Sequence, residues 1–504
     1  MHTSAIHHYV IAGGGTAGWM TAALLGKLLN GTGARITLVE SPDQPGVGVG
    51  EATVPSFVDF IKLLGIDEQT FVKATQATFK LGIQFSHWQT LGHSYWHPFG
   101  HVGARIDGKP FFQQWLHAHR SGLTQTYTDF SASARMAQEN KFYIPNPQQP
   151  NNLSQMGYAY HFDAQQVAVF LRDFAVSKGV VHKKALIEHV QMCPDNSVIQ
   201  RLITRTGEHI DGDFFIDCTG TQARLMGQAL NTGFTDWQRY LPVDHAWVVQ
   251  TQNTDEPVPY TKAIAEPMGW RWQIPLQHRT GNGLVFCSQY TSPVEAKRYL
   301  QTQLTTPLLN EPRLLTFKTG HLEQFWRSNC VAIGLSAGFL EPLESTGIYL
   351  IMRGILNLTK LLPSSPPCQA TIHEYNQLML SEYQHIRDFI VLHYHLTQRD
   401  DSAFWDFYRN MEIPESLQHR MAMFAEHGYV WPDDVSLFRV DSWVQVMMGQ
   451  GLMPGSYHQA GKLLPPEGLK QQLTALKNQI DNQLAQLPPH AQFIEKYCPA
   501  GKVG

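Results

Sequence analysis

The chain has 504 residues, of which 43% are hydrophobic, so it can bury a large core and is long enough for two or three domains or for one domain with large insertions. Charged residues make up 16% and the formal net charge is −4, which excludes the strongly basic surface of proteins that bind nucleic acid or anionic membranes. The six cysteines form no CxxC pair and indicate neither a disulfide framework nor a metal site. The sequence shows no leader-like N-terminus and no apolar stretch long enough to span a bilayer, so we expect a cytoplasmic protein.

The N-terminal segment predicts a strand, a glycine-rich turn and a helix. The apolar run 8–12 is followed by Gly13-Gly-Gly15-Thr-Ala-Gly18 and then by a helical stretch up to residue 29. Gly13 permits a tight turn, Gly15 lets the backbone approach a pyrophosphate, and Gly18 lets the helix pack closely on the strand. We therefore expect the phosphates of a dinucleotide to be bound by Gly13, Gly15, Thr16, Ala17 and Gly18.

A second predicted strand, over residues 35–39, ends at Glu40, where an acid can hold the ribose hydroxyls of the dinucleotide. This pattern fits NAD as well as FAD. Two apolar strands much later in the chain, 214–217 and 331–333, also end in glycine turns. Strands that rejoin the same sheet so late in the sequence favour an FAD fold with long insertions. No second GxGxxG offers a site for NAD(P)H, so we expect FAD, with further contacts from Gly334 and Leu335, and a separate reductase that supplies FADH2.

Four motifs resemble those of the flavin-dependent tryptophan halogenases. They are Gly48-Val-Gly-Glu51-Ala-Thr-Val-Pro55, Phe79-Lys-Leu-Gly-Ile-Gln-Phe85, Gly269-Trp-Arg-Trp-Gln-Ile-Pro275 and Glu341-Pro-Leu-Glu344-Ser-Thr-Gly347. The resemblance implies that Gly50, Glu51 and Ala52 lie beside the flavin. It also implies an α/β fold (α+β with insertions), in which an FAD-binding Rossmann-like domain of the flavin monooxygenase type is joined to a mostly helical C-terminal region that covers the substrate.

The predicted domains follow from that resemblance and from the positions of the strands. Residues 1–90, 150–222 and 318–362 form a discontinuous FAD-binding module, and 91–149 and 223–317 are insertions that carry the substrate wall and the GWxWxIP strand. The remaining part, 363–504, is the mostly helical region, with clear helical patterns over 375–395 and 469–487. We expect its polar residues Asp388, His393 and His395 to be structural, and we expect no metal ion.

Lys80 is the first predicted catalytic residue. The apolar side chains at 79, 81, 83 and 85 alternate as on a strand, so Lys80 faces away from the core, into solvent or into a cavity. Solvent is the usual place of a lysine. The resemblance instead implies that Lys80 binds hypohalous acid and presents its halogen to the substrate, and an ammonium group in a dry cavity loses its proton more easily.

Glu344, the second predicted catalytic residue, comes just before a helix predicted over 347–362. An acid at this place can simply be a favourable charge on the helix dipole. The resemblance implies that Glu344 polarises the halogen donor together with Lys80, or accepts the proton that leaves the ring. The free N–H groups of Thr346 and Gly347 suit a halide ion, chloride or bromide, at the same helix start.

Trp270 and Trp272 share one face of a predicted strand with Ile274. Packing in the core or over the surface explains such a pair, but the resemblance implies that this motif, up to Pro275, keeps the organic substrate away from the flavin. His97 and Phe99 resemble the family residues that flank the substrate ring, with core packing as the alternative. Trp443 and Tyr457 are candidates to complete the aromatic pocket.

The reaction that the resemblance implies is the halogenation of an electron-rich aromatic ring such as an indole. A flavin hydroperoxide, formed from FADH2 and dioxygen, oxidises the halide, and hypohalous acid travels through the protein to Lys80 and Glu344. The sequence offers no clear place for the tyrosines that grip the backbone of free tryptophan, so an indole derivative or a larger substrate fits as well. The alternatives are an FAD-dependent aromatic monooxygenase and a protein that holds FAD without turnover, and both a monomer and a homodimer are compatible with the sequence.

Overall fold

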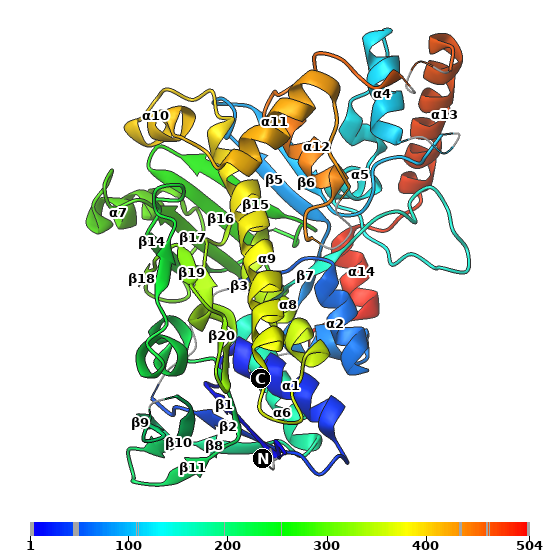
Figure 1. The fold of residues 1–504 in the computed structure, drawn as a ribbon. Helices are drawn as coiled ribbons and strands as arrows, with labels where there is room; N and C mark the ends of the chain where they lie inside the picture. Colours follow the sequence, from blue (N-terminus) through cyan, green and yellow to red (C-terminus); the bar gives the residue numbers. More distant parts are fainter. Residues whose placement is uncertain are drawn as a thin grey trace. The chain divides into compact units, whose positions relative to one another are not determined.

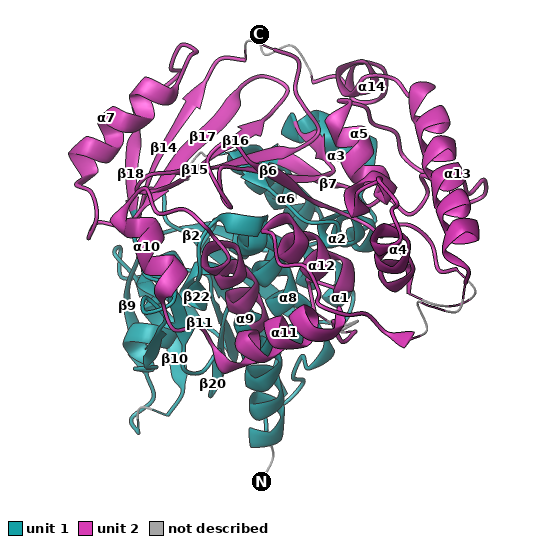
Figure 2. Ribbon diagram, turned by 90° about the horizontal axis from the view of Figure 1, so that it is seen from above, with its two compact units in different colours: residues 1–76, 162–244, 316–384 teal, residues 77–161, 245–315, 385–504 magenta. Residues whose placement is uncertain are grey.

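The computed structural model describes residues 5–43, 50–106, 108, 110–195, 197–253, 255–432, 436–459, 462 and 464–500. The chain divides into two compact units, each assembled from three segments (Figure 2). Unit 1 consists of residues 1–76, 162–244 and 316–384, and unit 2 consists of residues 77–161, 245–315 and 385–504.

Unit 1 is built on a six-stranded sheet with the order β20-β21-β12-β1-β2-β8. Its strand β1 (His8–Ala12) pairs in parallel with β2 (Arg35–Glu40) and with β12 (Phe214–Asp217), and all five residues of β1 are buried. A strand that is buried on both faces has a continuous apolar sequence, which explains why β1 shows no alternation. The other strands of this sheet are β8 (Val181–Lys184), β20 (Trp326–Arg327) and β21 (Cys330–Ala332).

The helices of unit 1 complete the βαβ arrangement that the glycine pattern predicted. α1 (Thr16–Leu29) connects β1 to the parallel strand β2 and packs against α6 (Ala164–Ser177) and α8 (Thr346–Lys360) (Figure 1). The further elements of unit 1 are β3 (Gly50–Ala52), α2 (Ser56–Leu64), α3 (Glu68–Thr75), β9 (Ile187–Met192), β10 (Ile199–Thr204), β11 (His209–Asp211), η2 (Gly220–Gln222), η3 (Arg224–Ala229), β13 (Phe234–Asp236), β19 (Gly320–Leu322), η4 (Gly334–Ser336), β22 (Gly338–Phe339) and η5 (Leu343–Ser345).

Unit 2 contains a seven-stranded sheet with the order β18-β14-β17-β16-β15-β5-β6. Its strand β16 (Gly269–Pro275) pairs antiparallel with β15 (Thr261–Glu266) and β17 (Thr280–Phe286), and β15 pairs in parallel with β5 (Gly82–Ser86). The other elements that belong to unit 2 or continue into it are β4 (Thr78–Lys80), β6 (Ser94–Pro98), α4 (Phe111–Arg120), η1 (Tyr127–Phe130), α5 (Ala132–Gln138), β7 (Ala159–Asp163), β14 (His245–Thr251), α7 (Pro293–Gln303), β18 (Arg313–Thr316), α9 (Gln369–His395), α10 (Ala403–Asn410), α11 (Glu415–His427), α12 (Val440–Gly449), α13 (Pro466–Ala485) and α14 (His490–Tyr497).

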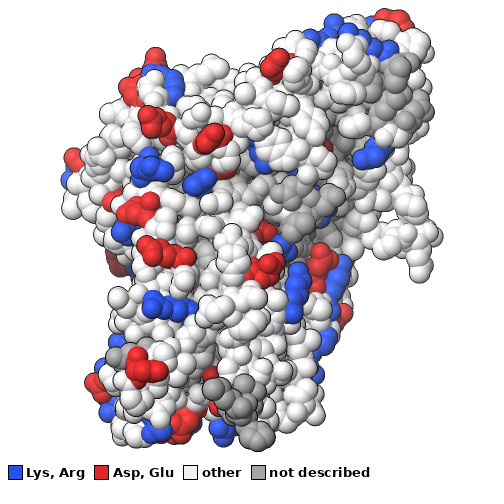
Figure 3. All heavy atoms as spheres, in the orientation of Figure 1, with Lys and Arg blue, Asp and Glu red and all other residues white. Residues whose placement is uncertain are grey.

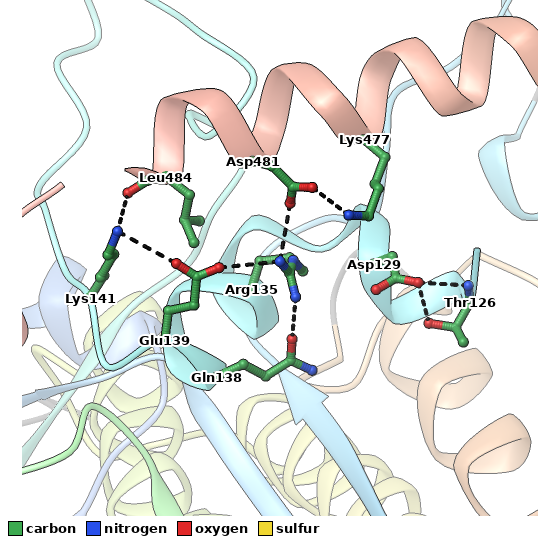
Figure 4. Close-up of polar contacts among 9 residues, drawn as sticks. All are labelled: Thr126, Asp129, Arg135, Gln138, Glu139, Lys141, Lys477, Asp481 and Leu484. Atoms are coloured by element: carbon green, nitrogen blue, oxygen red, sulfur yellow. Dashed lines mark hydrogen bonds and ion pairs between the residues drawn. The ribbon is translucent and has the colours of Figure 1, made fainter. Parts of the chain in front are cut away.

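Polar contacts tie helix α13 to the rest of unit 2 (Figure 4). Arg135 of α5 donates a hydrogen bond to Asp481 of α13 at 3.1 Å and pairs with Glu139 at 3.2 Å. Lys141 donates to the carbonyl oxygen of Leu484 at 2.8 Å. Partly exposed ion pairs of this kind contribute only about 0.2–1 kcal/mol each, so they fix the place of α13 more than they stabilise the fold.

The limits of the two units differ from the predicted domain limits. The segment 77–90, predicted within the FAD-binding module, belongs to unit 2 because β5 pairs with β6 and β15 there. The single strand predicted over 79–85 is interrupted at Leu81, whose N–H donates to the carbonyl of Pro259 at 2.8 Å. The helices predicted over 347–362, 375–395 and 469–487 are found as α8, α9 and α13. The role predicted for each segment stays a prediction.

Charged side chains of both signs are interspersed over the face that Figure 3 shows. Among the residues described, no helix has the length and apolar character needed to cross a membrane. In the same part of the chain, no group of three or more His, Cys, Asp or Glu residues is placed to hold a metal ion.

Candidate active site

The glycine turn after β1 has the geometry of a phosphate site. Gly13 has a φ of +113°, and a Cβ atom there would lie 2.1 Å from the carbonyl oxygen of Cys218, while one at Gly18 would lie 1.9 Å from that of Gly13. Packing therefore requires these two glycines. Gly15, in contrast, faces open space, and helix α1 begins there without a side-chain cap, so the N–H groups of its first turn are free for a pyrophosphate.

Glu40 lies at the end of β2, beside the same turn. Its side chain packs against Gly14, where a Cβ atom would lie 2.4 Å from the Glu40 Cγ. One carboxylate oxygen, Oε2, is 2.7 Å from Nε2 of His182, a contact that the sequence did not predict. Among the described residues the other oxygen has no hydrogen-bond partner, so it can accept a hydrogen bond from a ribose hydroxyl.

The turn after β21 lies against the start of α1. Gly334 has a φ of +78°, and a Cβ atom at Gly334 would lie 2.8 Å from the Cβ of Ala17 and 3.3 Å from Ile351 of α8. Its neighbour Leu335 is 44% exposed. Unit 1 thus brings the glycine turn, Gly334 and helix α8 together, and these residues fit an FAD molecule that lies along the first turn of α1.

The segment of the GVGEATVP motif is described only from Gly50 onward; Gly48 and Val49 lie outside the described residues. Gly50 and Ala52 of β3 are buried, with Glu51 between them. Burial, with the carboxylate of Asp163 as a second cause, raises the pKa of Glu51 to about 7. Glu51 can therefore hold a proton near neutral pH.

Glu344 is held in a strained conformation directly before α8. Glu344 and Ser345 have φ angles of +66° and +61°, a region that costs a non-glycine residue on the order of 1–3 kcal/mol. The Glu344 side chain is only 2% exposed. Helix α8 has no side-chain cap, Thr346 is buried, and a Cβ atom at Gly347 would meet open space, so this helix start can accept an anion such as halide.

Lys80, in unit 2, is completely buried, so the solvent-facing alternative is wrong. Its Nζ lies 5.0 Å from the centre of the Phe99 ring, which brings a predicted catalytic residue and a predicted substrate residue together. His97 packs on Phe389 and Phe438, with ring centres 5.3 and 6.0 Å apart, and Trp443 meets Phe389 edge-on at 4.9 Å. His97 and Trp443 therefore belong to one buried aromatic cluster.

The GWxWxIP strand, β16, adjoins the strand of Lys80. Trp270 and Trp272 are both buried, with ring centres 5.9 Å apart, and Ile274 is buried on the same face. The Trp272 ring covers Gly283, where a Cβ atom would lie 2.1 Å from it. The carbonyl oxygen of Pro275 accepts a hydrogen bond from Thr78 at 2.7 Å, which joins the end of β16 to β4.

A sequence model of the tryptophan halogenase family matches residues 8–466, which is most of the chain. The chain belongs to the tryptophan halogenase family. It is similar in structure to the flavin-dependent halogenase Xcc4156 from Xanthomonas campestris (TM-score 0.95, 45% identity, 99% of each chain covered). A second similar structure is BrvH, a flavin-dependent halogenase from Brevundimonas sp. BAL3 (TM-score 0.94, 40% identity, 98% of this chain and 99% of that one). Tryptophan 6-halogenase SttH from Streptomyces toxytricini is 33% identical, over 98% of this chain and 99% of its own.

As a member of the tryptophan halogenase family, this enzyme halogenates an electron-rich aromatic ring with FADH2, dioxygen and halide, which decides against the monooxygenase alternative. The predicted fold class, an FAD-binding Rossmann-like domain with a mostly helical C-terminal region, is confirmed as well.

The sequence did not predict the polar residues around Lys80 in this halogenase. His161 lies opposite Thr78 in the β4–β7 pair, so Thr78, Lys80 and His161 share one face of the two strands. His161 also contacts Thr261, with Nε2 and Oγ1 2.9 Å apart. His490 accepts a hydrogen bond from the N–H of Phe79 at 3.2 Å. These histidines come from distant segments; only the two-residue spacing of Thr78 and Lys80 was visible as a signal.

Proposed function

We propose that this flavin-dependent halogenase acts on an indole ring and that Lys80 and Glu344 are its catalytic residues. The observation that carries this proposal is the place of Lys80, a fully buried ammonium group beside the Phe99 ring, on a strand bonded to the GWxWxIP strand. Burial of a lysine costs free energy, because desolvation destabilises its charged form. A fully buried lysine therefore indicates a functional role. The relatives SttH and RebH, named as tryptophan halogenases, act on an indole-bearing amino acid.

Each residue has a task that follows from its surroundings. Reduced FAD at the glycine turn supplies, with dioxygen, the oxidising power that converts halide into hypohalous acid. The N–H groups of Thr346 and Gly347 hold the halide beforehand. Lys80 donates a hydrogen bond from Nζ to the hypohalous acid and so makes the halogen more electrophilic. Glu344 accepts at its carboxylate the proton that the ring loses when the new bond forms.

The substrate wall of unit 2 favours a flat apolar ring. His97, Phe389, Phe438 and Trp443 form a continuous buried aromatic cluster, which suits an indole. The substrate ring is kept away from the flavin, as we propose, by the GWxWxIP residues Trp270, Trp272, Ile274 and Pro275. A separate reductase supplies FADH2. The six cysteines are all free, which favours a reducing compartment such as the cytoplasm.

The proposal is tested with Lys80→Met, which removes the ammonium group and keeps most of the chain length. We expect FAD binding and peroxide release to be unchanged, while product formation falls by at least about a hundredfold, the lower range for a general acid. The matched control is Lys262→Met, because Lys262 lies in the same part of unit 2, on β15. Halogenation at the wild-type rate in Lys80→Met would remove Lys80 from the mechanism, and equal loss in both variants would indicate damage to the sheet.

A further inference from the structure

Unit 2 contains a cavity of about 780 Å³ that the proposed halogenation mechanism does not use. It lies at the C-terminal ends of α4 and α11 and beside residues 456–459, and it is lined among others by Arg120, Met423, His427, Tyr429, Tyr457 and Lys462. Tyr457, which the sequence suggested for the aromatic substrate pocket, lines this cavity, whereas Lys80, Phe99 and Trp443 do not. Its volume is within the range of small-molecule sites, roughly 300–1,000 Å³.

The wall of this cavity carries two cations around one aromatic ring. The guanidinium carbon of Arg120 lies 5.4 Å from the centre of the Tyr457 ring, and Nζ of Lys462 lies 5.8 Å from it. Arg120 also donates a hydrogen bond to the carbonyl of Pro454. In the described part of the chain neither cation forms an ion pair, and no Asp or Glu lines the cavity. Arg120 and Lys462 therefore give the cavity a positive charge that no carboxylate among the described residues pairs with.

A hydrogen bond to His117 holds the Tyr457 ring in place. Its hydroxyl is 2.8 Å from Nδ1 of His117, which is only 7% exposed and whose Nε2 has no hydrogen-bond partner among the described residues. The end of α4 is fixed in turn, because Lys470 of α13 donates to the carbonyl of Ser121 at 3.0 Å. A fixed ring costs little entropy when a ligand stacks on it, so this wall is organised before binding.

We propose that this cavity binds a small planar aromatic carboxylate, with its ring against Tyr457 and its carboxylate group on Arg120 and Lys462. Arginine suits this group because its planar fork matches a carboxylate with two parallel hydrogen bonds. Met423 and Tyr429 supply apolar contact for the ring. The site goes beyond the proposed halogenation and needs neither halide nor reduced flavin.

The test uses the FAD-loaded enzyme, without reductant or halide, with 13C-methyl methionine. The Met423 methyl signal, assigned with Met423→Leu, reports on this cavity alone. We expect it to shift and saturate with indole-3-acetate, and to move far less with indole or acetate alone. Arg120→Gln combined with Lys462→Gln should weaken binding at least tenfold. The matched control is Lys297→Gln, since Lys297 is also stacked on an aromatic ring, Trp247, but lies outside the cavity.

Three results would overturn the proposal. They are a Met423 signal that does not move with indole-3-acetate, one that moves equally with neutral indole, and one whose titration is unchanged by the double substitution. Lys462→Gln alone gives a further check, because Lys462 is exposed and its replacement does not endanger folding. Bromination or chlorination of indole should be unchanged in these variants, so failure of this site and failure of the halogenation proposal are seen separately.

Discussion

The hydroxyl oxygen of Thr78 lies 3.2 Å from Nδ1 of His161. Because Thr78 gives its one hydrogen to the carbonyl of Pro275, it can only accept from His161, and Nδ1 must carry the proton. Nε2 then accepts from Thr261. His161 is therefore neutral beside Lys80, and burial, with the charges of Lys80 and His490 as further causes, lowers the pKa of His161 well below its usual value.

Thr78→Val should destabilise the enzyme, because it leaves the buried His161 N–H and the Pro275 carbonyl without their partner. We expect a loss of about 1–3 kcal/mol in the free energy of unfolding. Thr78→Ser keeps the hydroxyl and should restore most of it. Urea unfolding of the three proteins checks this, and equal stability of the valine and serine variants would contradict the assigned hydrogen bonds.

His490 should make the enzyme sensitive to acid. Its Nδ1 donates to the Pro257 carbonyl at 2.7 Å and its Nε2 accepts from Phe79, so the neutral form is required, and burial lowers the pKa of His490 to about 4. A histidine with a depressed pKa contributes stability that is complete above about pH 6.5 and is lost as the pH falls toward 4, at a total cost of up to about 3 kcal/mol.

The measurement for His490 is the melting temperature between pH 7.5 and pH 5. His490→Leu should be less stable at pH 7.5, since two buried backbone groups lose their partner, but its melting temperature should fall less on acidification. His7→Gln, at an exposed position, serves as the control. A fall as steep in His490→Leu as in the wild type would assign the acid sensitivity to other groups.

Gly15→Ala should separate cofactor binding from folding. A methyl group at Gly15 meets no protein atom within 4 Å, so the apo-enzyme should keep its melting temperature, yet the methyl group would occupy the space proposed for the pyrophosphate. We expect FAD affinity to fall at least about tenfold, which is about 1.4 kcal/mol. Gly468→Ala, equally open and at the start of α13, should leave FAD binding unchanged. Unchanged FAD affinity in Gly15→Ala would place the phosphates elsewhere.

Glu344→Gln should slow halogenation by about 10²–10⁴-fold, the usual contribution of a general base, and should leave FAD binding intact. The amide keeps the shape of the side chain at this buried, left-handed position, so folding should be preserved. Glu341→Gln is the matched control, because Glu341 is buried three residues earlier in the same motif. Single-turnover product formation distinguishes the two variants. If Glu341→Gln is slower than Glu344→Gln, the catalytic role belongs to Glu341 instead of Glu344.

The sequence predicted those elements that depend only on neighbouring residues. Apolar runs and glycine spacing indicated strand β1, helix α1 and Glu40 at the end of β2, because a turn of six residues is determined by its own sequence. The burial of Lys80 could not be predicted, since it depends on segments far along the chain such as Phe99 and His161. The break at Leu81 was missed for the same reason, because the partner that interrupts the strand is Pro259.

The backbone of Glu344 shows a second limit of local patterns. The sequence placed an acid before a helix, but the left-handed φ at Glu344 and Ser345 is imposed by the structure around them and runs against their own preference. Such conflicts between local preference and fold concentrate at functional sites, which supports the role proposed for Glu344.

Halogenation of indole by this enzyme can be measured by mass spectrometry after incubation with FAD, a flavin reductase, NADH and either bromide or chloride. We expect a product with the isotope pattern of one bromine or one chlorine, formed by the wild type and Lys262→Met and at least about a hundredfold less abundant with Lys80→Met. A halogen-free oxygenated indole, or a halogenated product of equal yield from Lys80→Met, would contradict this expectation.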